Sequence, residues 1–215
     1  MLYSYLFLIL MINHLSFINS TEQLLTAAAS STHCMIENHQ YQSEYLYHKL
    51  SNQNHDSNIG LVSKDILLGD STTTLGASTS SNVGPKLIWK FIQVNPPLNR
   101  LFYIRSARYN EFLCSSNDHV TILELRRKVN IFRMNKLSIM INKKCMWRIE
   151  TVQKRNKTNL YYIWNEAHNE PLYASSNIGL MIGDSTRRSV YTWRNKPNSE
   201  QFIWNISCHN QNILP

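Results

Sequence analysis

The sequence lacks long hydrophobic runs beyond its first residues. Residues 1–20 contain no Lys, Arg, Asp or Glu, and their apolar run from Leu6 to Ile12 is shorter than the roughly 20 residues that a membrane-spanning helix needs. The segment ends at Ser20, a small residue of the kind that precedes a signal-peptidase cut. We therefore expect a cleaved signal peptide at residues 1–20, a secreted, extracellular protein and no transmembrane segment.

The motifs of several enzyme classes are also missing. The 215 residues contain neither a Gly-rich phosphate-binding loop nor a Gly-x-Ser-x-Gly nucleophile turn. The eight histidines show no metal-ligand spacing, and there is no Cys-x-x-Cys pair to suggest zinc. We expect a protein that is not an enzyme, with no catalytic residues, no metal and no cofactor.

Cysteines and glycosylation signals fit a secreted protein. All four cysteines follow the expected signal peptide, and an even number in an oxidising compartment favours disulfides. Three pairings are possible for Cys34, Cys114, Cys145 and Cys208. Two acceptor motifs predict N-glycosylation, at Asn156 in a polar turn and at Asn205 on an expected strand.

What the sequence does contain is a strand-and-turn pattern. From Tyr45 onward, short runs rich in Tyr, Phe, Ile, Leu and Trp alternate with clusters of Asn, Ser, Asp and Gly. No long stretch after Tyr45 has a helical apolar period, which predicts an all-β fold. Residues 21–42 are polar and mixed around Ala27-Ala28-Ala29, and form a leader that could be a short helix or a mobile segment.

One tryptophan-containing strand occurs three times. The copies contain Trp89, Trp147 and Trp204, which lie 58 and 57 residues apart. After the first two copies come a polar linker and an aromatic strand, at residues 101–105 and 160–164. A further strand follows at residues 109–116 and 168–176. This regular spacing indicates an internal repeat.

The first repeat is more divergent. We match its residues Tyr45–His48 to the aromatic strand of the later repeats. Residues 57–61 and 68–72 echo residues 176–180 and 182–186. Each second stretch contains Gly-Asp-Ser-Thr, which we interpret as a turn, because Gly allows positive φ and Asp or Ser caps nearby amides.

Three units of about 55 residues, each with about four short strands, resemble the β-trefoil superfamily. The resemblance covers residues 43–209, in units 43–96, 97–153 and 154–209, with a tail at 210–215. Three such units around a pseudo-threefold axis would close a barrel and leave few edges. The three tryptophans are then expected in or near the core.

The resemblance also favours one disulfide pairing. Closing the barrel brings the chain ends together, so Cys34, just before the first unit, is expected to pair with Cys208 in the last strand. Cys114 and Cys145 end the second strand and open the fourth strand of one unit, which predicts a second disulfide between them.

Particular trefoil families share single features with the chain. Residues 183–186, running into the aromatic strand 189–193, resemble the trefoil half of insect haemolymph lipoproteins of the 30K type, which implies a lipid ligand. That family carries an N-terminal helical domain, for which this chain has no room. Ricin-type lectins, and fascin-like trefoils, are similar in their closing strands. Ricin-type units end in Gln-x-Trp, which is absent here, and their sugar-binding Asp would fall near Ser115 or Ser175.

Positive charge is distributed unevenly. Residues 100–157 hold 14 Lys and Arg against 4 Asp and Glu, a balance of +10, whereas the whole chain carries +8. A basic surface attracts sulfated glycans, anionic lipid or nucleic acid, and secretion argues against nucleic acid. A merely solvated basic face is the alternative. The candidate ligand-binding cations are Arg126, Arg127, Lys128, Lys143, Lys144, Lys154 and Arg155.

Aromatic residues that do not repeat in all units are candidates for an exposed binding surface. They are Trp164, Tyr173 and Trp193, together with Tyr191. The expected function is a secreted, monomeric, non-enzymatic trefoil that binds an extracellular glycan, lipid or protein. One narrower alternative is heparin-like acidic-glycan binding through the basic second unit, which the trefoil growth factors suggest by resemblance. Another is protease inhibition, as in the Kunitz inhibitors, which are secreted trefoils with two disulfides.

Overall fold

A computed structural model describes most of the chain after residue 32. The described residues are 33–49, 57–63, 87–94, 100–120, 125–133, 142–152, 160–178, 188–194 and 199–209. Several predictions fall outside them: the signal peptide, both Gly-Asp-Ser-Thr turns, the tail, and the candidates Lys154, Arg155 and Asn156. In the described part, no helix is long and apolar enough to cross a membrane.

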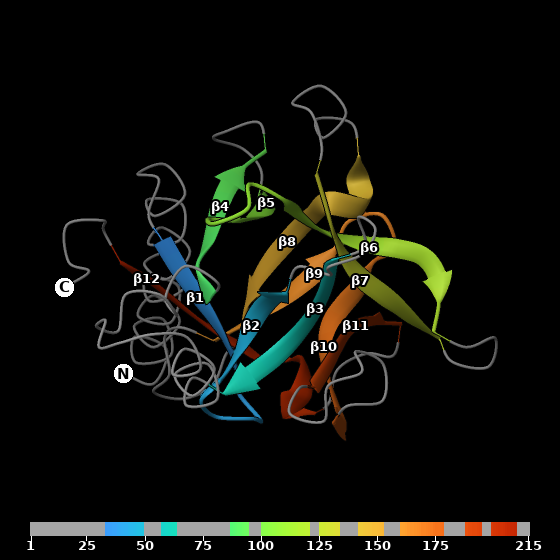
Figure 1. Cartoon of the computed structure of the whole chain (residues 1–215). Helices are drawn as coiled ribbons and strands as arrows, with labels where there is room; N and C mark the ends of the chain where they lie inside the picture. The colour runs from blue at the N-terminus through green and yellow to red at the C-terminus, as the bar shows by residue number, and fades with distance from the viewer. Residues whose placement is uncertain are drawn as a thin grey trace, which may run out of the picture.

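The described residues form twelve strands, four in each of three successive units (Figure 1). The first unit contains β1 (His33–Asn38), β2 (Glu44–Lys49), β3 (Ser57–Ser63) and β4 (Trp89–Gln93). The second contains β5 (Leu101–Ser106), β6 (Phe112–His119), β7 (Arg126–Phe132) and β8 (Met146–Thr151). The third contains β9 (Leu160–Asn165), β10 (Glu170–Ile178), β11 (Arg188–Trp193) and β12 (Trp204–His209). Short 3-10 helices η2 (Lys143–Cys145) and η3 (Glu200–Phe202) precede β8 and β12. The predicted all-β fold is confirmed.

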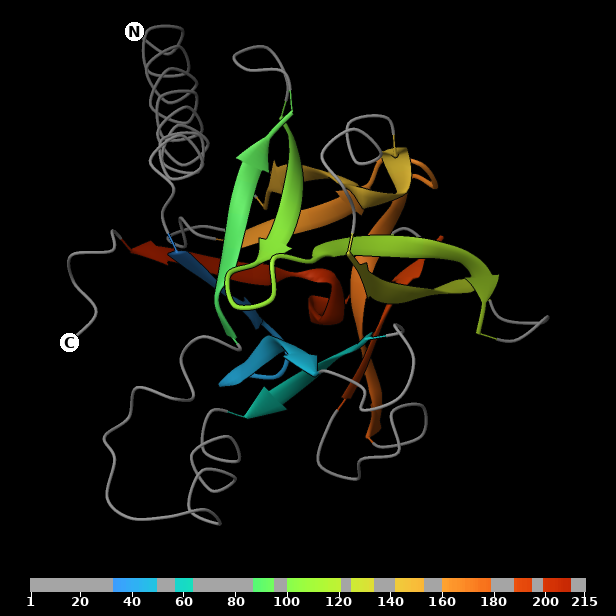
Figure 2. The ribbon, with the colours of Figure 1, turned by 45° about the horizontal axis from the view of Figure 1, so that its top comes forward.

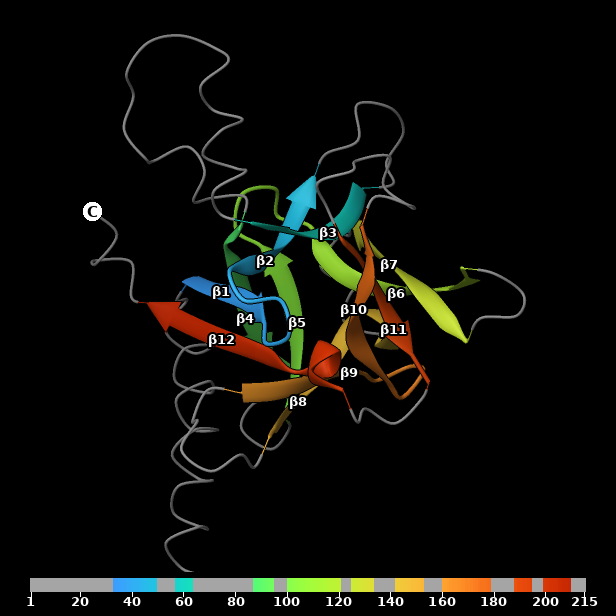
Figure 3. The same ribbon diagram turned by 90° about the horizontal axis from the view of Figure 1, so that it is seen from below.

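The first and fourth strands of each unit close a barrel. The antiparallel pairs run in a ring, β1–β12, β12–β9, β9–β8, β8–β5, β5–β4 and β4–β1. The remaining strands form three hairpins that pair with one another through β3–β7, β7–β11 and β11–β3. Closure leaves few open sheet edges, which is the physical reason for assembling three copies of one unit. Seen from below, the hairpin β6–β7 lies on the side opposite β1 and β12 (Figure 3).

The three tryptophans lie in the core, as predicted. Trp89, Trp147 and Trp204 are each 0% exposed. Each indole Nε1 donates a hydrogen bond to a leucine carbonyl on the second strand of the same unit. The pairs are Trp89–Leu46, Trp147–Leu113 and Trp204–Leu172, at 3.0, 2.8 and 3.0 Å. A buried N–H without a partner would destabilise the barrel, and these bonds remove that cost in all three units.

The first unit begins earlier than expected. Strand β1 lies within residues 21–42, so the expected boundary at residue 43 is one strand too late. It was missed because it contains no aromatic residue, although Cys34, Ile36 and Asn38 alternate inward. Matching Tyr45–His48 to the aromatic strands was therefore wrong, since β2 is a second strand.

The match between residues 57–61 and 176–180 was also wrong. Residues 57–61 lie in β3, the third strand of its unit, whereas Ser176 lies in β10, a second strand. The tryptophan–leucine bonds give the correct alignment, in which Glu44, Glu111 and Glu170 occupy equivalent positions two residues before the bonded leucines.

Each of these glutamates follows a tight turn. The residues before them, Ser43, Asn110 and Asn169, have positive φ values of 66°, 57° and 50°. A short polar side chain at the end of the preceding strand accepts hydrogen bonds from backbone amides in the turn. These capping residues are Asn38, Ser106 and Asn165.

Both predicted disulfides are present. Cys34 and Cys208 are directly opposite each other on β1 and β12, the first and last strands, which lie side by side (Figure 2). Cys114 on β6 is joined to Cys145 in η2. The first disulfide therefore ties the chain ends where the barrel closes, and the second ties a hairpin to the loop beside it.

Candidate functional site

Arg127 is not part of a free basic surface. Its Nε donates to Oε1 of Glu170 at 3.0 Å, and the side chain of Glu170 is 1% exposed. Its Nη1 donates to the carbonyl of Asn117 at 2.9 Å. Thr192 Oγ1 donates to the other carboxylate oxygen of Glu170 at 2.9 Å. Arg127 is thus held in a buried ion pair between the second and third units.

The same arginine stabilises a bulge in β6. The register passes from Ser115 opposite Val129 to His119 opposite Arg127, so β6 has two more residues than β7 over this interval. A bulge of this kind changes the direction of side chains along a strand. In β6 the bulge spans Ser116, Asn117 and Asp118, and it therefore determines the directions in which their side chains point.

The third unit repeats this arrangement. Its register passes from Ala174 opposite Val190 to Ile178 opposite Arg188, again with two extra residues. Arg188 donates from Nη1 to the carbonyl of Ser176 at 2.8 Å and from Nε to Glu44. In the first unit, β2 and β3 pair without a shift and Ser57 takes the place of the arginine. The arginine and the bulge are both present in the second and third units and both missing from the first. We therefore interpret Arg127 as a residue that positions the bulged part of β6.

The expected aromatic surface of the third unit is mostly covered. Tyr173 and Tyr191 are 3% and 6% exposed, so the expectation that they are exposed was wrong, and Trp193 is half-buried. Arg126 lies over Trp193, with its guanidinium carbon 4.8 Å from the ring centroid. Phe202 stacks on the same ring, at 5.8 Å between centroids. Trp193 and Tyr173 are enclosed because η3 and Arg126 pack on the outer face of β10 and β11.

Trp164 lies in a separate group on β8 and β9. It is half-buried beside Tyr162, at 6.4 Å between ring centroids, and Arg148 lies 5.7 Å from its ring. Arg148 forms ion pairs with Glu150 and Glu166, at 2.8 and 3.5 Å. Trp164 therefore contacts a neutralised arginine.

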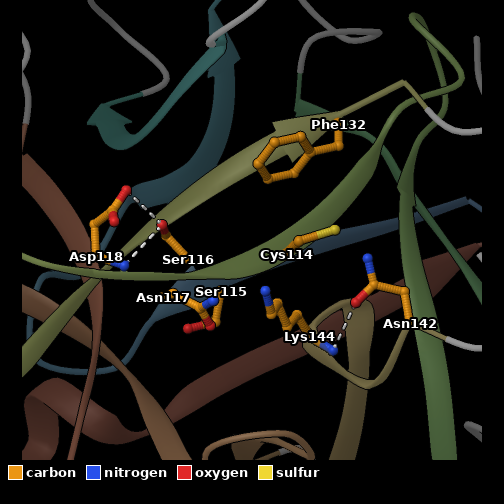
Figure 4. A pocket seen from close by; sticks show the side chains of 8 residues that line it. All are labelled: Cys114, Ser115, Ser116, Asn117, Asp118, Phe132, Asn142 and Lys144. Carbon is orange, nitrogen blue, oxygen red and sulfur yellow. Dashed lines mark hydrogen bonds between the residues drawn. The ribbon is translucent and has the colours of Figure 1, made fainter.

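A pocket lies between the hairpin β6–β7 and η2. Its volume is about 320 Å³, and its lining residues are Cys114, Ser115, Ser116, Asn117, Asp118, Phe132, Asn142 and Lys144 (Figure 4). Lys144 extends from η2 toward β6 in this view. The Cys114–Cys145 disulfide joins the strand on one side to the helix on the other. The pocket is thus built between two covalently linked walls.

The backbone that carries Lys144 is fixed from both sides. Its amide donates to Oδ1 of Asn142 at 3.1 Å, and its carbonyl accepts from Nδ2 of Asn165 at 2.7 Å. On the opposite wall, Asp118 accepts a hydrogen bond from the hydroxyl of Ser116 at 3.1 Å. The pocket therefore presents one cation and one carboxylate on locally ordered backbone.

Three lysines of the second unit lie on the elements that build this pocket: Lys144 lines it, Lys143 precedes it in η2, and Lys128 lies on β7, the strand that carries Phe132. Among the described residues, no ion pair involves Lys128, Lys143 or Lys144. Lys128 and Lys143 are exposed, and Lys144 is half-buried. Of the predicted cations, these three are available to a ligand, while Arg126 and Arg127 are engaged within the protein.

One histidine lies in the field of these charges. Burial lowers the pKa of His168, as do the neighbouring charges of Arg127, Lys144 and His119, while Glu170 acts in the opposite direction. Its buried Nε2 has no hydrogen-bond partner among the described residues. The neutral form of His168 is therefore favoured beside this site.

Sequence reasoning missed the polar lining of the pocket. Ser116, Asn117, Asp118, Phe132 and Asn142 were not among the candidates. A signal was present, because a run of polar residues follows Cys114 and Asn142 precedes the Lys-Lys-Cys of η2. Once the disulfide is known, these two polar segments must meet.

Comparisons with known proteins address the fold. No family model and no curated protein matches the sequence. Among solved structures, an SDF2-like protein from Arabidopsis thaliana has a TM-score of 0.56 and 11% identity, covering 82% of this chain and 92% of that one. ThreeFoil, a designed threefold symmetric protein, has a TM-score of 0.53 and 8% identity, covering 81% and 96%. The chain is a β-trefoil.

A lectin also shares the trefoil architecture. The Polyporus squamosus lectin has a TM-score of 0.52 and 11% identity, covering 82% of this chain and 49% of the lectin. At such identities the likeness concerns the fold alone, since trefoils host unrelated activities. The similarity to 30K-type lipoproteins stays a resemblance of sequence.

Proposed function

We propose that this trefoil is a secreted, non-enzymatic protein that binds acidic glycans through its second unit. The observation that carries the proposal is that Lys128, Lys143 and Lys144 form no ion pair in the described part of the chain, and that Lys144 lines a pocket of about 320 Å³. Cations on a concave surface concentrate an anionic ligand and speed its association.

Two further observations support the extracellular setting and the ligand class. The two disulfides are typical of proteins that fold in an oxidising compartment. The Polyporus squamosus lectin, which shares the fold, is bound to the glycan epitope Neu5Acα2-6Galβ1-4GlcNAc. Because this chain matches only 49% of that lectin, the lectin supports the ligand class and not the position of the site.

Heparin binding tests the proposal. The variant Lys128→Ala with Lys143→Ala should elute from immobilised heparin at lower NaCl than the wild type. The slope of log affinity against log salt should fall by about one for each lysine removed, because each releases a counterion on binding. The measurement is affinity at several NaCl concentrations.

The control variant removes the same charge elsewhere. Arg108 is exposed in the turn after β5, and Lys90 is half-buried on β4 in the first unit. Arg108→Ala with Lys90→Ala should leave the salt slope close to that of the wild type. If both variants lose heparin affinity equally, the interaction depends on net charge alone and not on these lysines, which contradicts the proposal. A wild-type protein that is not retained on immobilised heparin would also contradict it.

A further inference from the structure

The pocket of the second unit and the aromatic cluster of the third occupy equivalent places. Cys114 and Tyr173 each follow the leucine that accepts the tryptophan bond. Cys145 and Phe202 each lie two residues before the tryptophan. Phe132 and Trp193 each follow the partner of that leucine on the next strand. The two regions are therefore the same part of the repeat, filled with different residues.

In the third unit, aromatic rings fill this space. Tyr173 lies 4.9 Å from Phe202 and 5.0 Å from Trp193, measured between ring centroids. In the second unit a disulfide replaces two of the three rings, and only Phe132 remains. Sulfur atoms occupy far less volume than a phenol and a phenyl ring. The link keeps the two walls together and leaves a pocket between them.

The groups that face this pocket differ in charge. Lys144 supplies an ammonium group and Asp118 a carboxylate. Asn117 and Asn142 supply amides that both donate and accept, and Phe132 supplies an apolar ring. A small inorganic anion would be attracted by Lys144 and repelled by Asp118. No ion pair joins Lys144 to Asp118, so a neutral sugar would cover the Lys144 ammonium group with no anionic group in contact with it, which costs free energy.

We infer that this pocket binds one acidic sugar unit of a glycan, with its acidic group on Lys144 and its hydroxyls on Asp118 and the amides. This inference rests on the proposed function and specifies its ligand. A sugar ring has the hydroxyls to donate to Asp118 and an apolar C–H face for Phe132. The volume is at the lower end of the range for small-molecule sites, as one ring requires.

The disulfide makes this site rigid before the ligand arrives. It joins β6, which carries Ser115 to Asp118, to η2, which carries Lys144. Arg127 fixes the bulge on one wall, and Asn142 and Asn165 fix the other. Binding to a preformed site avoids the entropic cost of ordering loops.

Calorimetry with small sugars tests the inference separately from heparin binding. The ligands are a glucuronic-acid disaccharide without sulfate, a sulfated disaccharide without carboxylate, lactose and sodium sulfate. At least one acidic disaccharide should bind, and the stronger of the two identifies the acidic group. Binding of lactose or sodium sulfate with equal affinity would overturn the inference.

Three variants locate the binding. Lys144→Ala should lower the affinity for the acidic disaccharide at least about tenfold, and Asp118→Asn should lower it about fivefold. Each substitution removes a hydrogen bond to a charged group. Cys114→Tyr with Cys145→Phe copies the third unit, fills the pocket and should abolish disaccharide binding while retaining most heparin affinity. Arg108→Ala, which removes an exposed charge outside the pocket lining, is the control and should leave disaccharide binding unchanged.

The failures can be told apart. If heparin binds through Lys128 and Lys143 but no acidic disaccharide binds, the inference is wrong and the proposed function stands. If heparin itself does not bind, the proposed function fails. If the ring variant does not fold by circular dichroism, Asp118→Asn decides, and unchanged affinity in that variant would overturn the inference.

Discussion

The second and third units have the same inner layer and different outer layers. Inside, Trp147 and Trp204 form equivalent bonds to Leu113 and Leu172, and all four residues are fully buried. Outside, the second unit has a disulfide and a pocket, whereas the third has a packed aromatic cluster. The fold therefore depends on positions that face the axis, and the positions that face outward are free to differ.

The first unit supports this distinction. Tyr47 and Leu87 take the places of Cys114 and Cys145, and they are 4% and 2% exposed. In the first and third units, apolar or aromatic side chains therefore fill the space that the disulfide occupies in the second unit. In the second unit alone, these positions carry a covalent bond, and this unit also carries Lys128, Lys143 and Lys144, which form no ion pair in the described part of the chain.

The largest expected effect comes from removing the disulfides. On the chain-entropy model, Cys34→Ala with Cys208→Ala should lower the free energy of unfolding by about 5 kcal/mol, because that link closes a loop of 174 residues. Cys114→Ala with Cys145→Ala removes a link that closes a loop of 31 residues and should cost about 4 kcal/mol. Guanidinium unfolding measures both.

A variant with the rings of the third unit in place of the Cys114–Cys145 disulfide tests whether the two outer layers are interchangeable. If rings and disulfide are alternative fillings of one space, Cys114→Tyr with Cys145→Phe should be more stable than the double alanine variant. The reason is that the rings restore buried contacts that alanine removes. A ring variant no more stable than the alanine variant would mean that the two outer layers are not interchangeable.

The next largest loss of unfolding free energy is expected from replacing Arg127 or Arg188. Arg127→Leu removes the cation that lies 3.0 Å from the buried carboxylate of Glu170, which then keeps only Thr192 and the more distant Arg194, and should cost about 3 kcal/mol. Arg188→Leu should cost less, because the side chain of Glu44 is 23% exposed against 1% for Glu170, so that water can solvate it. Chemical denaturation of the two variants measures this difference, and equal losses would show that burial does not separate the two ion pairs.

The smallest expected effect concerns pH. The pKa of His168 is lowered from its ordinary value of 6.5 in the folded state, so below that pH the unfolded chain binds more protons than the folded one. Stability should therefore fall as the pH drops from about 6.5 toward the folded pKa, and level off below it. His33, whose pKa is also lowered, adds to this slope.

Melting temperatures between pH 7.5 and 5 measure the effect. His168→Gln should reduce the slope without removing it, because His33 still titrates. A slope that His168→Gln leaves unchanged would show that the neutral form of His168 is not what the fold favours.

N-glycosylation at Asn205 stays a prediction. The residue is half-buried on β12, and its Nδ2, the atom that would carry a glycan, donates to Oε2 of Glu37 at 3.2 Å. Glu37 is its direct partner on β1. A glycan here would break a contact at the place where the barrel closes.

The sequence alone was enough for the all-β class and the threefold repeat, and the β-trefoil resemblance carried by that repeat led to the buried tryptophans and both disulfides. The class and the repeat follow from local alternation and from residues with the same role in each unit, such as Trp89, Trp147 and Trp204, whereas the disulfide pairing needed the closed barrel that the resemblance implies. The first unit was misaligned because β1 has no aromatic residue, so its strand signal was weaker than that of β2. A pattern that depends on aromatic residues cannot locate a strand without them.

Only the tertiary structure decided which residues form the site. A count of charges treats Arg127 and Lys144 alike, yet Arg127 meets Glu170 from the next unit and Lys144 meets no carboxylate in the described part of the chain. Likewise, Cys114, Phe132 and Lys144 are far apart in sequence and share one pocket only because β6, β7 and η2 pack together. The physical reason is that strand alternation determines which side chains face inward, whereas the outer surface depends on contacts between distant segments.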